Sequence, residues 1–263
     1  MRNVVCLLSA VPVRSGPSHE EEMVTQMVFG EHAAILDKQQ KWSLVEISAD
    51  SYQGWVYNSS VYEIPDDLAE AMAASRPEVS GSIVLMVMNN KDRQPFYISA
   101  GSLLYDYDPG TGSFRTGGQE FTCLQAPDFH KGKSVRGNIA TVAREFMNVP
   151  YLWGGKTPFG MDCSGFTQIV FRLFGINLPR NSRQQVDLGK PVASVTEALA
   201  GDLAFFQNEQ GRIIHTGLVT GNGQILHASG MVRIDRLDQT GIYNNLSGSY
   251  THRLKIIKNI SDT

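Results

Sequence analysis

The chain has 263 residues, a length that suits more than one domain without requiring three large ones. Hydrophobic residues make up 42% of the chain and charged residues 19%, so we expect a packed core and no extended disorder. The formal net charge of −3 and the absence of a basic run argue against nucleic acid as a partner. No apolar run approaches the roughly 18 residues of a membrane span, so we expect no membrane partner either.

Three cysteines lie far apart in the sequence, at Cys6, Cys123 and Cys163. An odd and sparse count argues against a disulfide framework, and there is no paired-cysteine metal motif. The apolar run near the start is too short for a secretory signal and favours a first β-strand instead. We therefore expect the cytoplasm as the location, although a leader trimmed from the chain would leave the same pattern.

Residues 1–64 are predicted to be all-β, because short β-prone segments alternate with turns rich in Gly, Pro, Ser and charged residues. The successive motifs V-P-V-R-S-G-P-S, V-F-G-E, W-S-L-V-E-I and S-Y-Q-G-W-V-Y resemble a bacterial SH3-type barrel. The expected strands are Val4–Leu8, Val11–Arg14, Met27–Phe29, Ala33–Asp37, Trp42–Ile47 and Gly54–Tyr57.

A helical linker is expected over residues 65–79. Its core is Asp66–Ala74, which has acidic residues in the first turn and strong helix formers after them. Residues 80–128 return to short β-prone segments and favour a second, divergent SH3-type barrel. The expected strands there are Ile83–Met88, Pro95–Ile98, Leu103–Tyr107, Ser113–Arg115 and Glu120–Gln125.

Residues 129–263 combine helices with later antiparallel strands, the pattern of an α+β domain. The expected helices are Asn138–Asn148, the segment that begins at Cys163, and Ser182–Leu188. The expected strands are Asp202–Phe206, His215–Thr220, Gln224–Ser229 and His252–Ile257.

Cys163 stands where a loop rich in Gly, Pro and aromatic residues gives way to an apolar helix. A thiol at a helix N-terminus meets unpaired N–H groups and the positive end of the helix dipole, which we expect to lower its pKa and populate the thiolate. The alternative is an inert buried cysteine, the commoner fate of a lone cysteine.

A thiolate nucleophile needs a base in reach and a third group that orients the base. His215 begins the strand H-T-G-L-V-T and His227 lies in the next strand, I-L-H-A-S, with G-N-G as the connecting turn. We expect this hairpin to place the two histidines side by side, facing the helix of Cys163. The alternative is two unrelated structural histidines.

The motifs D-C-S-G-F, H-T-G-L-V and I-L-H-A-S, in this order, closely resemble the NlpC-type family of papain-like cell-wall cysteine peptidases. Y-L-W-G-G, L-P-R-N-S-R-Q-Q and A-G-D-L-A-F-F match the same family. The resemblance covers roughly residues 130–258 and implies an α+β, papain-like catalytic domain preceded by one or two small SH3-type barrels.

The resemblance also implies the catalytic roles: Cys163 as nucleophile, His215 as general base, His227 as the group that holds it, and Tyr151 as an oxyanion donor. No cofactor and no metal is implied. A Cys/His/His set could bind zinc in principle, but no local metal-ligand motif is present.

Family members with an N-terminal barrel cleave after γ-D-glutamyl in peptidoglycan stem peptides that carry a free N-terminal L-alanine. By resemblance, Asp162, Tyr52 and an acidic residue of a barrel loop would bind the free amine. Glu22 is our choice for that acidic residue, with Glu21 and Glu31 as alternatives.

Trp153, Ser164 and Ser182 match positions that line the cleft around D-glutamate. Their alternatives are packing for Trp153, a helix-end hydrogen bond for Ser164 and an N-cap for Ser182. Arg180 and Arg183 could bind a carboxylate, but solvated charges are expected.

We therefore expect a γ-D-glutamyl-L-diamino acid endopeptidase that acts on L-Ala-γ-D-Glu-diamino acid murein peptides during recycling. Three alternatives remain open: a non-catalytic cell-wall binding protein, an amidase or acyltransferase that uses the same nucleophile, and a secreted hydrolase of intact wall. The preferred diamino acid and the oligomeric state are not fixed by the sequence.

Overall fold

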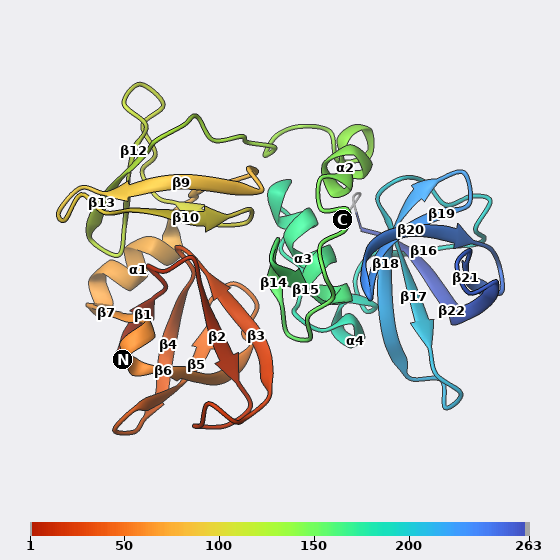
Figure 1. Ribbon diagram of the computed structural model, residues 1–263, viewed down its shortest axis with the longest axis horizontal. Helices are drawn as coiled ribbons and strands as arrows, with labels where there is room; N and C mark the ends of the chain where they lie inside the picture. The colour runs from red at the N-terminus through yellow and green to blue at the C-terminus, as the bar shows by residue number, and fades with distance from the viewer. Residues whose placement is uncertain (1, 261–263) are drawn as a thin grey trace. The chain divides into compact units, whose positions relative to one another are not determined.

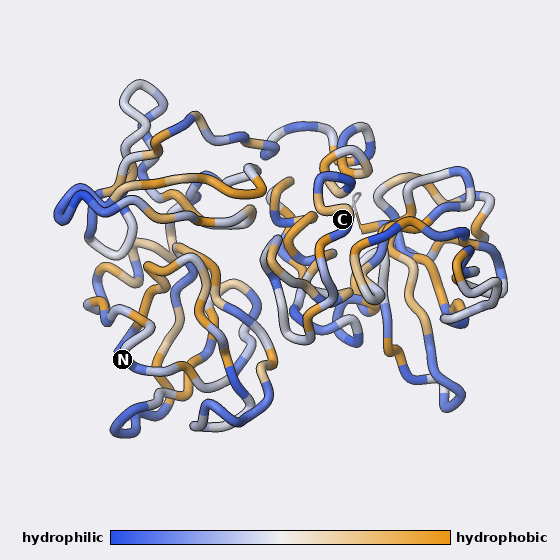
Figure 2. The backbone as a smooth tube through the Cα atoms, viewed as in Figure 1, coloured by the Kyte–Doolittle hydropathy of each residue, from blue (hydrophilic) through white to orange (hydrophobic). Residues whose placement is uncertain are grey.

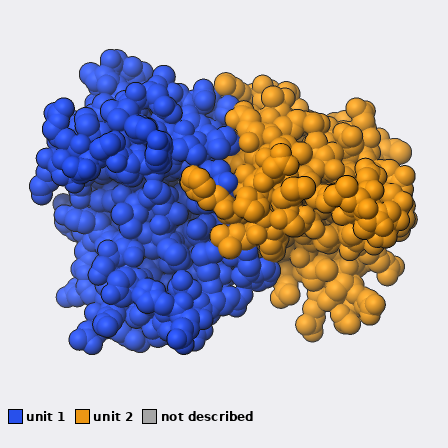
Figure 3. Space-filling model, in the orientation of Figure 1, with its two compact units in different colours: residues 1–131, 153–158 blue, residues 132–152, 159–263 orange. Residues whose placement is uncertain are grey.

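The computed structural model describes residues 2–260, so the extreme ends of the first and last predicted domains lie outside the described residues. The chain forms two compact units, coloured separately in Figure 3. The first comprises Met1–Lys131 and Trp153–Pro158, and the second comprises Gly132–Leu152 and Phe159–Thr263. A short piece of the loop before Cys163 thus belongs to the first unit. Both β-rich N-terminal segments also lie in that unit.

The first unit begins with a seven-stranded antiparallel sheet in the order β3-β2-β6-β5-β4-β1-β7 (Figure 1). Its inward-facing residues alternate with exposed ones, as expected for strands with one buried face. The strands are β1 Asn3–Val5, β2 Ala10–Arg14, β3 Met23–Val28, β4 His32–Lys38, β5 Trp42–Ile47, β6 Gln53–Tyr57 and β7 Tyr62–Ile64.

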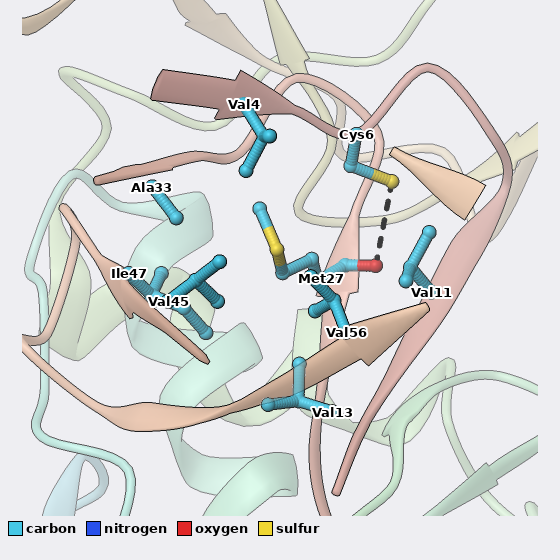
Figure 4. Close-up of a cluster of buried hydrophobic side chains, with 9 residues drawn as sticks. All are labelled: Val4, Cys6, Val11, Val13, Met27, Ala33, Val45, Ile47 and Val56. Atoms are coloured by element: carbon cyan, nitrogen blue, oxygen red, sulfur yellow. Dashed lines mark hydrogen bonds between the residues drawn. The ribbon is translucent and has the colours of Figure 1, made fainter. Parts of the chain in front are cut away.

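Aliphatic side chains from these strands form the core of the sheet, shown in Figure 4. Cys6 belongs to this core, and its thiol donates to the carbonyl oxygens of Leu8 at 3.2 Å and Met27 at 3.6 Å. The buried set is Val4, Cys6, Val11, Val13, Met27, Ala33, Val45, Ile47 and Val56.

The second β-rich segment forms a four-stranded sheet, β10-β9-β13-β12, and a two-stranded sheet, β11-β8. Phe29, the residue after β3, packs inside the core of this segment against Phe114 and Phe121. The two segments therefore share side chains in one core. The elements are η1 Asn58–Ser60, α1 Asp66–Ala74, β8 Glu78–Val79, β9 Val84–Asn89, β10 Pro95–Ser99, β11 Leu103–Leu104, β12 Ser113–Thr116 and β13 Gln119–Cys123.

The short segment Trp153–Pro158, which includes β14 Lys156–Thr157, is fixed within the first unit by a buried ion pair. The Lys156 ammonium lies 3.0 and 3.1 Å from the two carboxylate oxygens of Glu31, and neither side chain is exposed. The backbone N–H of Lys156 donates to Gln26 Oε1 at 2.8 Å.

The second unit is built on an antiparallel sheet in the order β16-β22-β17-β18-β19-β20-β21. Because β21 also pairs with β22, the strands from β22 to β21 close on themselves. Figure 2 shows the β17–β18 turn as hydrophilic, whereas the strands it joins carry buried apolar residues. The strands are β15 Gly160–Met161, β16 Lys190–Val192, β17 Asp202–Gln207, β18 Ile213–Gly221, β19 Gln224–Ser229, β20 Met231–Leu237, β21 Gly241–Asn244 and β22 Ser249–Asn259.

Three helices complete the second unit: α2 Val135–Arg144, α3 Cys163–Leu173 and α4 Ser182–Gln185. Every residue of α3 is buried, and this helix packs against α2 and against β18 and β19. Full burial explains why α3 is apolar around most of its surface. Among residues 2–260, no helix combines the length and apolar character that a membrane crossing needs.

Most predicted elements are confirmed within two or three residues, and α1, β5 and β19 match the expected ranges. The predicted helix 138–148 is shifted: α2 begins after Ser134, whose hydroxyl accepts from Gly137 N–H, and ends at Arg144. The helix predicted over 182–188 is also too long, since α4 ends at Gln185. Four strands of the described part of the second unit, β15, β16, β20 and β21, have no counterpart in the prediction.

Candidate active site

Cys163 is the first residue of α3, as the sequence predicts. The helix begins there because the Asp162 side chain caps it, accepting the Gly165 N–H at 2.7 Å. The Cys163 backbone N–H lies in the first turn, where helix geometry leaves donors without intrahelical partners. The thiol is buried, with 7% of the residue exposed.

Asp162 is itself held by a buried arginine. Arg180 donates through Nη1 to Oδ1 at 3.0 Å and through Nη2 to Oδ2 at 2.5 Å, a two-pronged pairing that fixes the carboxylate plane. Arg180 also donates to the Ser164 hydroxyl at 2.9 Å. The expectation that Arg180 is solvated is wrong, because only 1% of the residue is exposed and Asp162 compensates its charge.

His215 and His227 lie side by side on β18 and β19, as predicted. His215 Nε2 is 2.8 Å from His227 Nδ1, and the rings are perpendicular. Gly217 makes this approach possible, since an added Cβ there would lie 2.8 Å from His227 Cβ. The backbone N–H of Thr216, next to His215, donates to the Cys163 sulfur, which places the thiol at this point of β18.

The hydrogen bonds that begin at His215 continue through His227 to a residue that sequence reasoning missed. His227 Nε2 lies 3.1 Å from Asp235 Oδ2, and Asp235 is buried on β20. Because Asp235 pairs with Ile225, it shares a sheet face with His227, two residues along β19. The alternation of Val232, Ile234 and polar neighbours in M-V-R-I-D-R-L was the signal that could have revealed this strand.

A third histidine, also missed, stacks on His215. His252, from β22, has its ring centroid 4.1 Å from that of His215 with an angle of 26° between the planes. Burial and, to a smaller extent, the neighbouring His227 ring lower the pKa of His252 to about 4, although Asp235 opposes the shift. The neutral ring thus supports His215 from one side.

The thiol pKa differs from the prediction. The helix N-terminus was expected to lower it, but burial raises the pKa of Cys163 to about 12, and the nearby charge of Asp162 adds to the rise. Backbone N–H groups of Thr216 and Ser164, together with Arg180, act in the opposite direction without cancelling it. Desolvation therefore outweighs the helix end, and the resting sulfur is a thiol.

His215 is shifted in the complementary direction. Burial lowers its pKa well below 6.5, and the neighbouring His252 and His227 lower it further. Before the reaction both groups are neutral, so the imidazole can act as a base toward the thiol. The site can generate a nucleophile when Sγ passes its proton to His215.

Tyr151 lies near the thiol, where it is half-buried just before the loop enters the first unit. Burial raises the pKa of Tyr151 to about 12, and Cys163 and Asp162 add to the rise while Arg180 opposes it. The phenol therefore keeps its proton at neutral pH. It can donate a hydrogen bond to developing negative charge.

The three residues predicted to line the cleft around D-glutamate differ in how far they are exposed. Ser164 is buried and its hydroxyl donates to Asp162 at 3.2 Å. Ser182 is half-buried at the first residue of α4, where Asn181 is the N-cap residue, so the N-cap alternative for Ser182 is wrong. Trp153 is 59% exposed in the short segment of the first unit, which excludes simple core packing.

The residues predicted for the amine pocket divide between the units: Asp162 belongs to the second, and the barrel residues belong to the first. Glu22 is exposed, and among residues 2–260 its carboxylate has no hydrogen-bond partner. Tyr52 is half-buried against the core of the first sheet.

The two alternatives to Glu22 are engaged within the first unit. Glu21 accepts from the Ser15 hydroxyl at 3.0 Å. Glu31 is fully buried against Lys156 and also accepts the Val28 N–H at 2.8 Å, which removes it as an amine ligand.

No group of three or more His, Cys, Asp or Glu side chains within the described part of the chain has the arrangement of a metal site. His215 and His227 are joined by a hydrogen bond, and the Cys163 sulfur accepts from the backbone N–H groups of Thr216 and Ser164.

A cysteine at the start of a buried helix, bonded to the strand that carries one of two paired histidines, defines an α+β domain of the papain-like class. Residues 148–251 match the NlpC/P60 family, and residues 13–61 match the bacterial dipeptidyl-peptidase Sh3 domain. The chain therefore carries an NlpC/P60 domain together with a bacterial SH3 domain. The NlpC/P60 family consists of peptidoglycan hydrolases, and membership implies a cysteine peptidase that acts on peptidoglycan-derived peptides.

Relatives of similar organisation span most of the chain. A gamma-D-glutamyl-L-lysine dipeptidyl-peptidase of Bacillus subtilis is 28% identical over 229 residues, 82% of this chain and 75% of that protein. A protein of the same name from Bacillus cereus is 26% identical over 88% of this chain and 76% of its own length. Dipeptidyl-peptidase 6 of Lysinibacillus sphaericus is 25% identical, covering 90% and 92% of the two chains.

Solved structures agree on the fold. The crystal structure of an NlpC/P60 family protein from Bacillus cereus covers 98% of this chain and 99% of its own, with a TM-score of 0.80 at 19% identity. An NlpC/P60 endopeptidase from Photobacterium damselae covers 99% of this chain and 73% of its own, with a TM-score of 0.74 at 18% identity. The α+β, papain-like fold with an N-terminal SH3-like region is confirmed, and a second SH3-type barrel over residues 80–128 stays a prediction.

Proposed function

We propose that the chain hydrolyses the γ-D-glutamyl-L-diamino acid bond of murein stem peptides that carry a free N-terminal L-alanine. The observation that supports this best is the series Cys163, His215 and His227 at the junction of α3 and β18. The names of the relatives that span most of the chain support the bond class. Murein peptide recycling in the cytoplasm is part of the same proposal.

In the first step, Cys163 Sγ attacks the carbonyl carbon of the γ-glutamyl amide as His215 takes the thiol proton. The pKa values of the two groups place both in the neutral form beforehand, so proton transfer accompanies attack. The tetrahedral oxyanion is stabilised by the Tyr151 hydroxyl and the Cys163 backbone N–H.

Collapse of this intermediate breaks the C–N bond, and the imidazolium of His215 returns its proton to the leaving amine of the diamino acid. The L-Ala-γ-D-glutamyl group is left as a thioester on Cys163. Water, deprotonated by His215, then attacks the thioester. L-Ala-D-Glu departs and the thiol is restored.

The specificity for a free amine is assigned to Asp162, Tyr52 and Glu22. An ammonium group requires acceptors of opposite charge, and the exposed Glu22 carboxylate can supply one. The Asp162 carboxylate already binds Arg180, so it would contribute a remaining lone pair and not a free charge. Trp153, Ser164 and Ser182 are assigned to the D-glutamyl portion.

The test compares L-Ala-γ-D-Glu-diamino acid with its N-acetylated form, in L-lysine and meso-diaminopimelate versions, with Cys163→Ala as control. We expect L-Ala-D-Glu by mass spectrometry from the free-amine peptides alone, and none with the control. Equal cleavage of the acetylated peptides would refute the amine requirement. Cleavage of neither, combined with retention on cell wall, would support a binding module instead.

A second assay addresses the wall itself. Intact sacculi offer few stem peptides with a free L-alanine amine, so we expect no lysis. Release of soluble muropeptides from sacculi at a rate similar to tripeptide cleavage would contradict the recycling role and favour a secreted hydrolase.

A further inference from the structure

A buried polar series extends beyond the proposed base. His215 Nε2 is 2.8 Å from His227 Nδ1, and His227 Nε2 is 3.1 Å from Asp235 Oδ2. The three residues are 5%, 1% and 2% exposed. Each bond in such a buried series must have one donor and one acceptor, because an unmade hydrogen bond in the interior is costly.

The carboxylate at the end of the series is ionised at neutral pH. Burial raises the pKa of Asp235, but hydrogen bonds from His227 and Arg233, with their charges, outweigh burial and lower it below its ordinary value. An ionised carboxylate only accepts hydrogen bonds. His227 Nε2 must therefore carry the proton that it shares with Asp235.

The proton on His227 Nε2 also determines the tautomer of His215. A neutral imidazole has one N–H, so a proton on His227 Nε2 leaves His227 Nδ1 as an acceptor. His215 must then donate from Nε2, which leaves its other nitrogen, Nδ1, unprotonated. That nitrogen faces away from His227 and is free to accept the thiol proton.

We propose that Asp235 is a positioning residue that sets the tautomers of both histidines, so that the base nitrogen of His215 is the one without a proton. This inference rests on the proposed role of His215 as the base. Asp235 touches neither the thiol nor the substrate and acts through His227.

Arg233 holds Asp235 in the orientation that this role requires. Its Nε lies 2.9 Å from Asp235 Oδ2, and its Nη2 donates to Oδ1 at 2.9 Å. Nη2 also lies 3.4 Å from Asn244 Oδ1 on β21, which ties the pair to the next strand. The hydrogen bond at Oδ1 and the ion pair at Oδ2 together restrain the Asp235 carboxylate from rotating away from His227.

The same arrangement serves the charged state. When His215 has taken the thiol proton, it is an imidazolium whose Nε2–H points at His227. The Asp235 charge, transmitted through the His227 hydrogen bonds, stabilises that cation in a site with little water. The proton returns to the leaving amine, so Asp235 ends the cycle unchanged.

The decisive variant is Asp235→Asn, which keeps the shape and allows the side-chain amide to donate to His227 Nε2. That donation reverses both tautomers and places a proton on His215 Nδ1, where the thiol proton must go. A comparable Asp→Asn change in the Ser-His-Asp triad lowers kcat by about 10,000-fold. We expect a fall of at least about 100-fold in kcat with KM changed less than about twofold. Asp238→Asn is the matched control, because Asp238 follows the same strand but binds Tyr250.

Two readouts make the test independent of the substrate assignment. Long-range ¹H–¹⁵N spectra of ¹⁵N-histidine-labelled protein report tautomers directly, and we expect Nε2–H for His215 and His227 in the wild-type protein and Nδ1–H in D235N. Iodoacetamide alkylation of Cys163 should slow in D235N and not in D238N. A wild-type spectrum with His227 protonated on Nδ1, or wild-type alkylation and kcat in D235N, would overturn the proposal. Failure of the wild-type protein to cleave the peptide would instead count against the proposed function.

Discussion

Two buried cysteines, one in each unit, have the same thiol pKa and opposite surroundings. Cys6 is 0% exposed in the core of the first sheet, and Cys163 is 7% exposed at the start of α3. Burial raises the pKa of each to about 12. Burial and pKa therefore do not separate a structural thiol from a reactive one.

The difference lies in which hydrogen-bond partners face the sulfur. The carbonyl oxygens of Leu8 and Met27 accept from the Cys6 thiol and hold its proton, and Figure 4 shows the bond to Met27. Cys163 receives backbone N–H groups from Thr216 and Ser164, which favour negative charge on sulfur. A thiol becomes a nucleophile where donors and a neutral base surround it, whatever its resting pKa.

The largest expected effect comes from replacing each of the two cysteines by alanine. Cys163→Ala should abolish tripeptide cleavage, by at least about 1,000-fold, because no other group can form the thioester. Cys6→Ala should retain kcat and lose only about 1–2 kcal/mol of unfolding free energy through the small cavity that it leaves. Parallel steady-state kinetics and urea unfolding of both variants check this. Activity in C163A would break the comparison.

The ion pair beside Cys6 tests how the first unit compensates a buried charge. Lys156→Met leaves the Glu31 carboxylate buried without its partner, and we expect a loss of about 3–5 kcal/mol in unfolding stability. The double variant Lys156→Met, Glu31→Leu removes both charges and should recover most of that loss. Equal stability of the single and double variants would show that the pairing is not what matters.

Tyr151→Phe tests the oxyanion assignment in the second unit. We expect kcat to fall by about 100-fold with unfolding stability nearly unchanged, because the Cys163 N–H remains as the other donor. Tyr243→Phe, on β21 and edge-to-face against Tyr250, is a suitable control. A KM effect without a kcat effect would assign Tyr151 to substrate binding.

A smaller effect is expected from the pH dependence of unfolding stability. The folded pKa of His252 is about 4, below its unfolded value near 6.5, so the unfolded chain binds a proton that the folded chain does not. Stability should therefore decrease as pH falls below about 6.5, by an amount on the order of 1 kcal/mol at about pH 5.5. His252→Gln should remove this part of the pH dependence in urea unfolding, and His19→Gln, at an exposed position, should not. A pH dependence unchanged by H252Q would contradict the assignment.

Local patterns in the sequence were sufficient for much of the fold. Turn residues and alternation located most strands, and the acidic first turn located α1. Helix ends were less accurate, because α2 is set by the Ser134 cap and not by the later Pro150. The packing of Phe29 inside the core of the second β-rich segment depends on contacts distant in sequence, which no local pattern encodes.

The candidate site was also predicted where local patterns were sufficient and missed where distant strands contribute. Cys163 and the His215–His227 pair were located from helix and hairpin patterns, and the contact between the two histidines is confirmed. Asp235 and His252 were missed because they come from other strands of the sheet, and only the pairing of β20 and the course of β22 place them beside the histidines. The raised pKa of Cys163 depends on burial, which the helix-end argument did not include.

The most direct test of the central claim is competition among the three cysteines for limiting iodoacetamide in the native protein at neutral pH, followed by peptide mapping. Cys123 is half-buried with a pKa of about 11, so exposure and acidity alone would favour it over Cys163. We predict that Cys163 is alkylated first, Cys123 more slowly, and Cys6 only on unfolding. Alkylation of Cys123 before Cys163 would contradict the claim that the donors and base around Cys163 make it the nucleophile.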